Sequence, residues 1–295
     1  MRITQARFTT QLRTWVLIAG LTALLVAIGA VLGGKFLYIF VVFAVLMNLF
    51  GYWFSDKIAL AASRAKPVSE QEAPQLYKIL RELTARADLP MPRVYTIPSD
   101  QPNAFATGRN AKHAAVAVTE GLIKYLPEDQ IRGVLAHELS HVKNHDILVT
   151  TIAAMIAAAI STVANILQFS FLFGGLGSDD EESPLGFIGA LATIILAPIA
   201  AMLLQLAVSR QREFLADATG ARILGTGEPL AEALETLEKG VQAVPLNVNP
   251  AVAALYIVHP FRGQGIANLF STHPPLAERI RRLREYDAAQ GLHYG

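Results

Sequence analysis

The stretch that decides the fold is His137-Glu138-Leu139-Ser140-His141, which has the pattern H-E-x-x-H. In a helix the two histidines lie four residues apart on one face, where both imidazoles reach the same metal ion. Glu138 lies beside them and can act as a general base, so the pattern predicts a zinc hydrolase. The alternative is a pair of surface histidines on an amphipathic helix, because a pattern this short also arises by chance.

The residues around this pattern are typical of a helix. Pro127 and two acids favour a helix N-terminus, and apolar residues recur at helical spacing after it: Ile131, Val134, Leu135, Leu139 and Val142. We expect the helix to run straight towards an apolar stretch that begins near Ile147. His145 lies a full turn beyond the pair, too far to close a tetrahedral site, and we interpret it as a surface or boundary residue. His113 and His259 are interpreted as structural.

The composition is too apolar for an ordinary soluble protein. Of 295 residues, 53% are hydrophobic and 17% are charged, and the mean hydropathy is +0.38. The formal net charge is +1, and no basic patch is interleaved with aromatic residues, so nucleic acid is not an expected partner. Cysteine is absent, which excludes disulfides and thiolate zinc sites and leaves His, Glu and Asp as metal ligands.

Four apolar stretches are long enough to cross a lipid bilayer. They predict transmembrane helices at about residues 14–34, 36–54, 147–174 and 184–208. The first exceeds the apolar core of a signal peptide and a second follows at once, so we favour an uncleaved span over a cleaved signal. The last two are rich in alanine, and a helical hairpin buried within the protein is the alternative for them.

Positive charge is distributed unevenly between the segments that join these stretches. Basic residues precede the first span and follow the second and the fourth: Arg2, Arg7, Arg13, Lys57, Arg64, Lys66, Arg210 and Arg212. The opposite loops hold Lys35 alone, so both termini are predicted to face the cytoplasm. The chain then divides into a transmembrane hairpin (1–54), a cytoplasmic catalytic part (55–146), a second transmembrane hairpin (147–209) and a second cytoplasmic catalytic part (210–295).

The polar part before H-E-x-x-H is predicted to contain a helix and a small β-sheet. Residues 71–87 have helical apolar spacing, and residues 93–97 and 113–119 have the composition of strands. An edge of this sheet beside the metal could bind an extended peptide as an added strand, with plain core packing as the alternative. The residues predicted to bind substrate there lie between the two strands: Asn103, Ala104 and Phe105. Helices are also expected at 209–218, at 230–240 and after the prolines at 274–275.

A catalytic zinc site usually has a third protein ligand. Glu213 is the best candidate, because a hairpin of the third and fourth apolar stretches would return it to the helix of His137. Asp217 lies four residues further on the same helix face, where it can accept the outer N–H of a ligating histidine. The alternative is that both acids only pair with Arg210 or Arg212 on a solvated helix face.

Taken together, the motifs resemble those of the HtpX heat-shock membrane proteases, which are relatives of the CAAX prenyl endoproteases. The similar features are N-A-F-A-T-G at 103–108, H-E-L-S-H at 137–141, R-E-F-L-A-D at 212–217, T-H-P-P-L-A-E-R-I at 272–280 and a two-span hairpin. The resemblance covers nearly the whole chain. It implies an integral-membrane zinc peptidase of the gluzincin type in which His137, His141 and Glu213 bind one Zn²⁺ per chain and Glu138 is the general base.

The resemblance also implies an endopeptidase that cleaves misfolded or damaged membrane proteins on the cytoplasmic side of the bacterial inner membrane, in protein quality control and the stress response. It places the H-P-P segment near the cleft, so His273 is a candidate donor to the oxyanion, with a packed or capping histidine as the alternative. We therefore expect a mostly α-helical membrane protein with four transmembrane helices and a cytoplasmic gluzincin-like domain. The rival functions are a prenyl-type processing peptidase, a non-proteolytic zinc scaffold and a transporter.

Overall fold

The computed structural model describes residues 35–152, 210–243, 255–258 and 274–292, together with residues 19, 22, 23 and 26. The predicted spans at 14–34, 147–174 and 184–208 lie largely or wholly outside these residues, as do His259 and His273. Among the described residues, no helix has both the length and the apolar character needed to cross a membrane. The four predicted transmembrane helices are therefore not confirmed.

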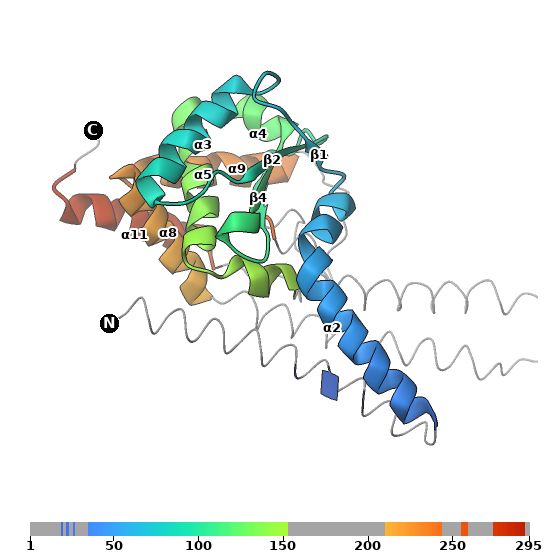
Figure 1. Ribbon diagram of the computed structural model, residues 1–295. Coiled ribbons are helices and arrows are strands. Elements are labelled where there is room, and N and C mark those ends of the chain that lie inside the picture. The colour runs from blue at the N-terminus through green and yellow to red at the C-terminus, as the bar shows by residue number, and fades with distance from the viewer. Residues whose placement is uncertain are drawn as a thin grey trace, which may run out of the picture.

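The described part is mostly helical around one small mixed sheet, as predicted (Figure 1). Its elements in chain order are α2 (Lys35–Ala62), β1 (Lys66–Pro67), α3 (Pro74–Ala87), β2 (Arg93–Ile97), β3 (Ala104–Thr107), the 3₁₀ helix η1 (Ala111–His113), β4 (Ala115–Thr119), α4 (Glu120–Tyr125), α5 (Glu128–Lys143), α8 (Arg210–Leu224), α9 (Glu228–Ala243) and α11 (Leu276–Ala289). A further helical segment begins at Ile147 and is described as far as Ile152.

The sheet has the strand order β1-β2-β4-β3. β2 and β4 are parallel, whereas β1 and β3 are antiparallel to their neighbours. The strand predicted at 113–119 begins at Ala115 instead, because η1 occupies the preceding residues and the side chain of Asn110 accepts a hydrogen bond from His113 N–H. β3 was not predicted from the sequence, because two of its four residues are alanines, which favour strands weakly. Its pairing with β4 decides its conformation.

The core lies between the sheet and the helices, with α5 at its centre (Figure 1). α5 packs against α3, α8, α9 and β3. Two glycines permit its closest approaches. A Cβ on Gly133 would lie 2.6 Å from the backbone nitrogen of Leu230 in α9, and one on Gly220 of α8 would lie 3.2 Å from the backbone nitrogen of His137. The absence of a side chain at Gly220 therefore lets α8 lie directly against the histidine-bearing helix.

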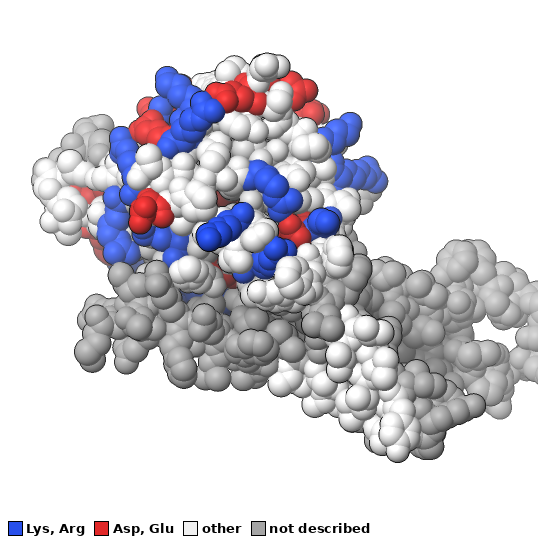
Figure 2. All heavy atoms as spheres, viewed as in Figure 1, with Lys and Arg blue, Asp and Glu red and all other residues white. Residues whose placement is uncertain are grey.

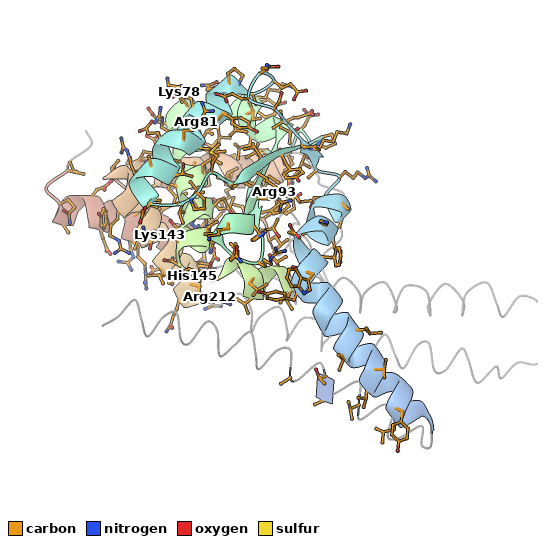
Figure 3. All side chains as sticks on the ribbon, viewed as in Figure 1. Lys78, Arg81, Arg93, Lys143, His145 and Arg212 are labelled. Carbon is orange, nitrogen blue, oxygen red and sulfur yellow. The ribbon has the colours of Figure 1, made fainter. Side chains whose placement is uncertain are left out.

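α5 does not run straight into the next helix, so that expectation is wrong. It ends at Lys143, and His145 has a left-handed backbone with φ of 62° (Figure 3). The N–H of His145 donates to the carbonyl of Val142 over 3.2 Å, and the N–H of Asp146 donates to the carbonyl of His141 over 3.1 Å. These two hydrogen bonds form a Schellman motif, which terminates a helix.

Candidate active site

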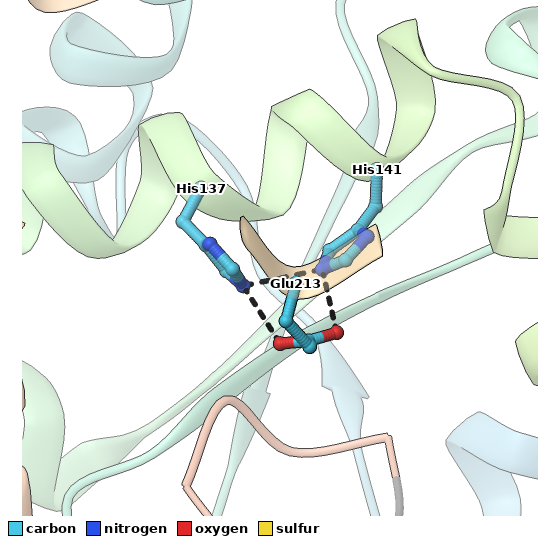
Figure 4. A group of neighbouring side chains, drawn as sticks. All are labelled: His137, His141 and Glu213. Carbon is cyan, nitrogen blue, oxygen red and sulfur yellow. Dashed lines mark hydrogen bonds and ion pairs between the residues drawn. The ribbon is translucent and has the colours of Figure 1, made fainter. Parts of the chain in front are cut away.

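Helices α5 and α8 bring the three predicted zinc ligands together (Figure 4). The Nε2 atoms of His137 and His141 are 3.1 Å apart. Glu213 lies in the first turn of α8, and its two carboxylate oxygens are each 3.7 Å from one of these nitrogens. One ligand atom from each residue lies within 4.8 Å of the other two, so the group can hold a metal ion.

The spacing and chemistry of these donors fit zinc. Zinc bonds of about 2.0–2.1 Å place the donors of a tetrahedral site about 3.3–3.4 Å apart, and the observed 3.1 and 3.7 Å separations lie on either side of that value. Two imidazoles and one carboxylate are also a common catalytic zinc set. The burial of acidic groups also favours a cation at this position, because four carboxylates in or next to the donor group are at most 3% exposed: Glu138, Asp146, Glu213 and Asp217. Arg279 balances one of these charges, and a divalent cation at the three donors would balance two more.

Glu138 is buried beside the two histidines. It is 2% exposed, and its Oε2 accepts a 2.7 Å hydrogen bond from the backbone N–H of Ala106 in β3. Burial is the main cause that raises the pKa of Glu138 to about 8, against the opposing effect of His141. A carboxylate with a pKa in this range accepts and returns a proton efficiently near neutral pH.

Asp217 lies where its predicted role requires. Its Oδ1 is 2.9 Å from Nδ1 of His137. Both of its oxygens also accept hydrogen bonds from Arg279 of α11, from Nη2 at 2.7 Å and from Nε at 2.9 Å. Burial lowers the pKa of His137 more than Asp217 raises it, so the ring is held in the neutral form that a metal ligand needs.

His141 has a second carboxylate partner that the sequence analysis missed. The Oδ1 of Asp146 is 3.1 Å from Nδ1 of His141, and Asp146 is 1% exposed. Burial opposes a charge on His141, but the nearby carboxylates of Asp146, Glu213 and Glu138 outweigh it and raise the pKa of the imidazole to about 10. A metal ion must therefore displace a proton from His141.

Arg279 was also missed as a site residue. Its side chain is fully buried, and besides Asp217 it donates a 3.1 Å hydrogen bond to the carbonyl of Ile257 and lies 3.9 Å from Glu213. Asp217 thus pairs with an arginine far along the chain. The T-H-P-P-L-A-E-R-I segment contains Arg279, but no local pattern in it reveals this contact.

The residues predicted to bind substrate have buried side chains in this structure. Asn103, Ala104 and Phe105 are all 0% exposed. Asn103 Nδ2 donates to the carbonyl of Val258 over 2.9 Å, and the Phe105 ring packs edge-on against Tyr256 with centroids 5.3 Å apart. These contacts attach residues 255–258 to β3. Substrate binding by these three residues stays a prediction, and it would have to use backbone atoms or displace these contacts.

Comparison with known proteins gives concordant results. The sequence profile described as peptidase family M48 matches residues 70–287. Proteins named "Protease HtpX homolog" are similar over most of their length: that of Syntrophobacter fumaroxidans is 57% identical over 275 residues (92% of this chain, 98% of that protein), and that of Pelotomaculum thermopropionicum is 54% identical over 274 residues (92% and 97%). A third, from Thermococcus sibiricus, is 51% identical over 284 residues (95% and 97%).

A solved structure is similar in fold. The crystal structure of S. mikatae Ste24p aligns with a TM-score of 0.50 and 21% sequence identity, covering 95% of this chain and 67% of that chain. At this identity the likeness concerns the fold alone.

Proposed function

Because the chain belongs to peptidase family M48 and is a metalloprotease, we propose that it is a membrane endopeptidase with one zinc ion per chain. Its substrates are misfolded or damaged membrane proteins, which it cleaves on the cytoplasmic side of a bacterial inner membrane as part of protein quality control and the stress response. The observation that carries the proposal is the meeting of His137, His141 and Glu213 beside the buried carboxyl of Glu138.

His137 and His141 would hold the ion through ring nitrogens and Glu213 through its carboxylate. When bound, the zinc ion supplies Lewis-acid chemistry, which polarises the scissile carbonyl and makes water a stronger acid near neutral pH. Glu138 takes a proton from the attacking water and returns it to the leaving amine. The N–H of Ala106 orients this carboxyl group, because it donates to Oε2.

The outer partners of the histidines fix their tautomers. Asp217 accepts from Nδ1 of His137 and Asp146 accepts from Nδ1 of His141. The Nε2 of His137 therefore presents its lone pair towards Glu213, and the Nε2 of His141 does so once a metal ion has displaced its proton. Arg279 holds Asp217 by two hydrogen bonds and thereby fixes the rotation of the carboxylate. The two rings are thus held in position before an ion or a substrate arrives, and only the proton on His141 has to leave.

The surface of α2 supports association with a membrane. Its side chains Tyr38, Val42 and Leu46 are 75%, 58% and 58% exposed, on a helix that leaves the body of the protein (Figure 1). Nearer the body, the guanidinium of Arg109 lies 4.6 Å from the ring centroid of the exposed Trp53, a pairing suited to a membrane–water interface. Lysine and arginine side chains also gather on the face of the body next to α2 (Figure 2), as expected beside anionic headgroups.

The catalytic proposal is tested with Glu138→Gln in the full chain, reconstituted in lipid vesicles with an unfolded membrane protein as substrate. The variant should keep stoichiometric zinc, because Glu138 is not among the three ligands, and should lose cleavage. Glu120→Gln, an exposed glutamate at the start of α4, is the matched control and should cleave like the parent. Equal cleavage by Glu138→Gln and the parent would contradict the general-base role.

The substrate proposal is tested by competition between an unfolded membrane protein and a prenylated peptide. Faster cleavage of the membrane protein supports quality control. Preference for the prenylated peptide would overturn that assignment in favour of a processing peptidase. A parent protein that binds zinc but cleaves neither substrate would favour the non-proteolytic scaffold.

A further inference from the structure

The turn that ends α5 returns Asp146 to the histidine five residues before it. In the Schellman motif the N–H of Asp146 donates to the carbonyl of His141 over 3.1 Å, while its side-chain Oδ1 lies 3.1 Å from Nδ1 of the same residue. His141 is therefore held by Asp146 at both its backbone and its ring. Glycine is the usual residue at the left-handed position of such a motif, but here that position is His145, with φ of 62°.

The surroundings of Asp146 favour its contact with the ring of His141. It is 1% exposed, so water does not solvate its charge. Within the described part of the chain, its second oxygen, Oδ2, has no hydrogen-bond partner. A buried carboxylate in this position keeps a proton on Nδ1 of His141, so Nε2 is the nitrogen that gives up its proton to a metal ion.

We propose that Asp146 is the positioning residue of His141: it fixes the ring and its tautomer so that Nε2 is presented to the metal. The proposal rests on the proposed zinc site and deepens it. The two histidines then differ in the surroundings of their carboxylate partners. Asp217 forms an ion pair with Arg279, whereas Asp146 contacts no arginine or lysine side chain within the described part of the chain and faces His141.

The same residue connects the metal ligand to the following helix. The carbonyl of Asp146 accepts the 3.3 Å hydrogen bond from Thr150 N–H that opens that helix. The next residue of this helix is Thr151, and its hydroxyl lies 3.0 Å from the hydroxyl of Thr107, at the end of β3. The start of this helix thus contacts β3, whose Ala106 donates a hydrogen bond to Glu138, and follows directly from Asp146, which contacts His141. A shift of the helix start would move both parts of the site.

The test measures zinc affinity of the full chain in detergent by competition with a chromophoric chelator. Loss of an outer partner of a ligating histidine typically weakens metal binding about 10–100-fold. We expect Asp146→Ala to fall in this range and Asp146→Asn to lose less, because the amide oxygen still accepts from Nδ1. Asp88→Asn is the matched control: Asp88 also ends a helix in a left-handed conformation, with φ of 53°, but it is exposed and follows α3, which carries none of the three metal ligands.

Thermal unfolding of the metal-free variants separates positioning from folding. The metal-free Asp146→Asn protein should unfold within a few degrees of the parent while its zinc affinity falls. A second pair tests the turn itself: His145→Asn should keep zinc affinity, since asparagine tolerates the left-handed region, and His145→Val should lower it as Asp146→Ala does.

Zinc affinity of Asp146→Ala equal to that of the parent would overturn the proposal, as would full affinity in His145→Val. A parent that binds no zinc would overturn the proposed function and this inference with it. Unchanged cleavage by Glu138→Gln would contradict the general-base role but not this inference, because zinc affinity is measured without any cleavage of substrate.

Discussion

Replacing Arg279 by methionine should destabilise the metal-free protein strongly. The guanidinium is fully buried and makes two hydrogen bonds to Asp217 and one to the carbonyl of Ile257. Methionine fills similar space but leaves the 3%-exposed carboxylate of Asp217 without its cation. Removing one partner of a buried ion pair typically costs about 3–5 kcal/mol, and we expect a loss of this size.

The double variant distinguishes an ion pair from lost packing. Asp217→Asn alone leaves the guanidinium uncompensated, so it should also be destabilising. When both charges are removed, neither penalty of an unpaired charge remains, and the double variant should lose less than the sum of the single losses by about 1–3 kcal/mol.

The assay is denaturant unfolding of chelator-treated full chain, followed by circular dichroism. Arg281→Met is the control on the same helix, because Arg281 is exposed and pairs with Glu278 and Glu285 at the surface. That variant should unfold close to the parent, because exposed ion pairs contribute little to stability. Additivity of the Arg279 and Asp217 effects to within about 0.5 kcal/mol would refute the argument that these two residues form one coupled unit.

Three further predictions concern the ligands, the packing and the pH dependence. Glu213→Ala should lose stoichiometric zinc in a metal analysis, and retained zinc would require a different third ligand. Gly133→Ala should destabilise the fold by about 1–3 kcal/mol in a denaturant titration, because its Cβ would lie 2.6 Å from the backbone of α9; unchanged stability would contradict that close approach. The metal-free protein should lose stability as pH rises from about 7 to 9. In the folded state the pKa of Glu138 is raised to about 8 and that of His141 to about 10. The folded state therefore binds more protons than the unfolded chain in this window, and its stability falls as these protons are lost. Zinc should weaken this dependence, and a stability that rises over the same window would contradict the assigned protonation.

Elements with a strong local pattern could be predicted from the sequence. The helix around H-E-x-x-H has apolar residues at regular spacing and a proline at its start, and it begins at Glu128, next to that proline. The strand at Arg93–Ile97 matches its prediction in both bounds. Glu213 and Asp217 could be placed on one helix face by counting residues, and their contacts with His137 agree with that spacing.

The contacts that sequence missed depend on backbone geometry or on residues far apart in the chain. Asp146 reaches His141 only because the chain turns at His145 after α5 ends, and a histidine in place of the usual glycine gives no signal of that turn. Arg279 is 62 residues from its partner Asp217, so no periodicity connects them. β3 becomes a strand by pairing with β4, not by its own composition. The membrane spans, the domain boundaries and the role of His273 stay predictions.

The burial of Arg279 has a consequence for the order in which the protein becomes active. The chain is synthesised from its N-terminus, so His137, Glu138 and Glu213 are all made before Arg279, whose guanidinium pairs with Asp217. Until α11 has folded onto α8 and α9, Asp217 lacks its cation and His137 lacks a fixed partner. The hydrogen-bond network around His137 is therefore completed only when this late helix of the chain has folded.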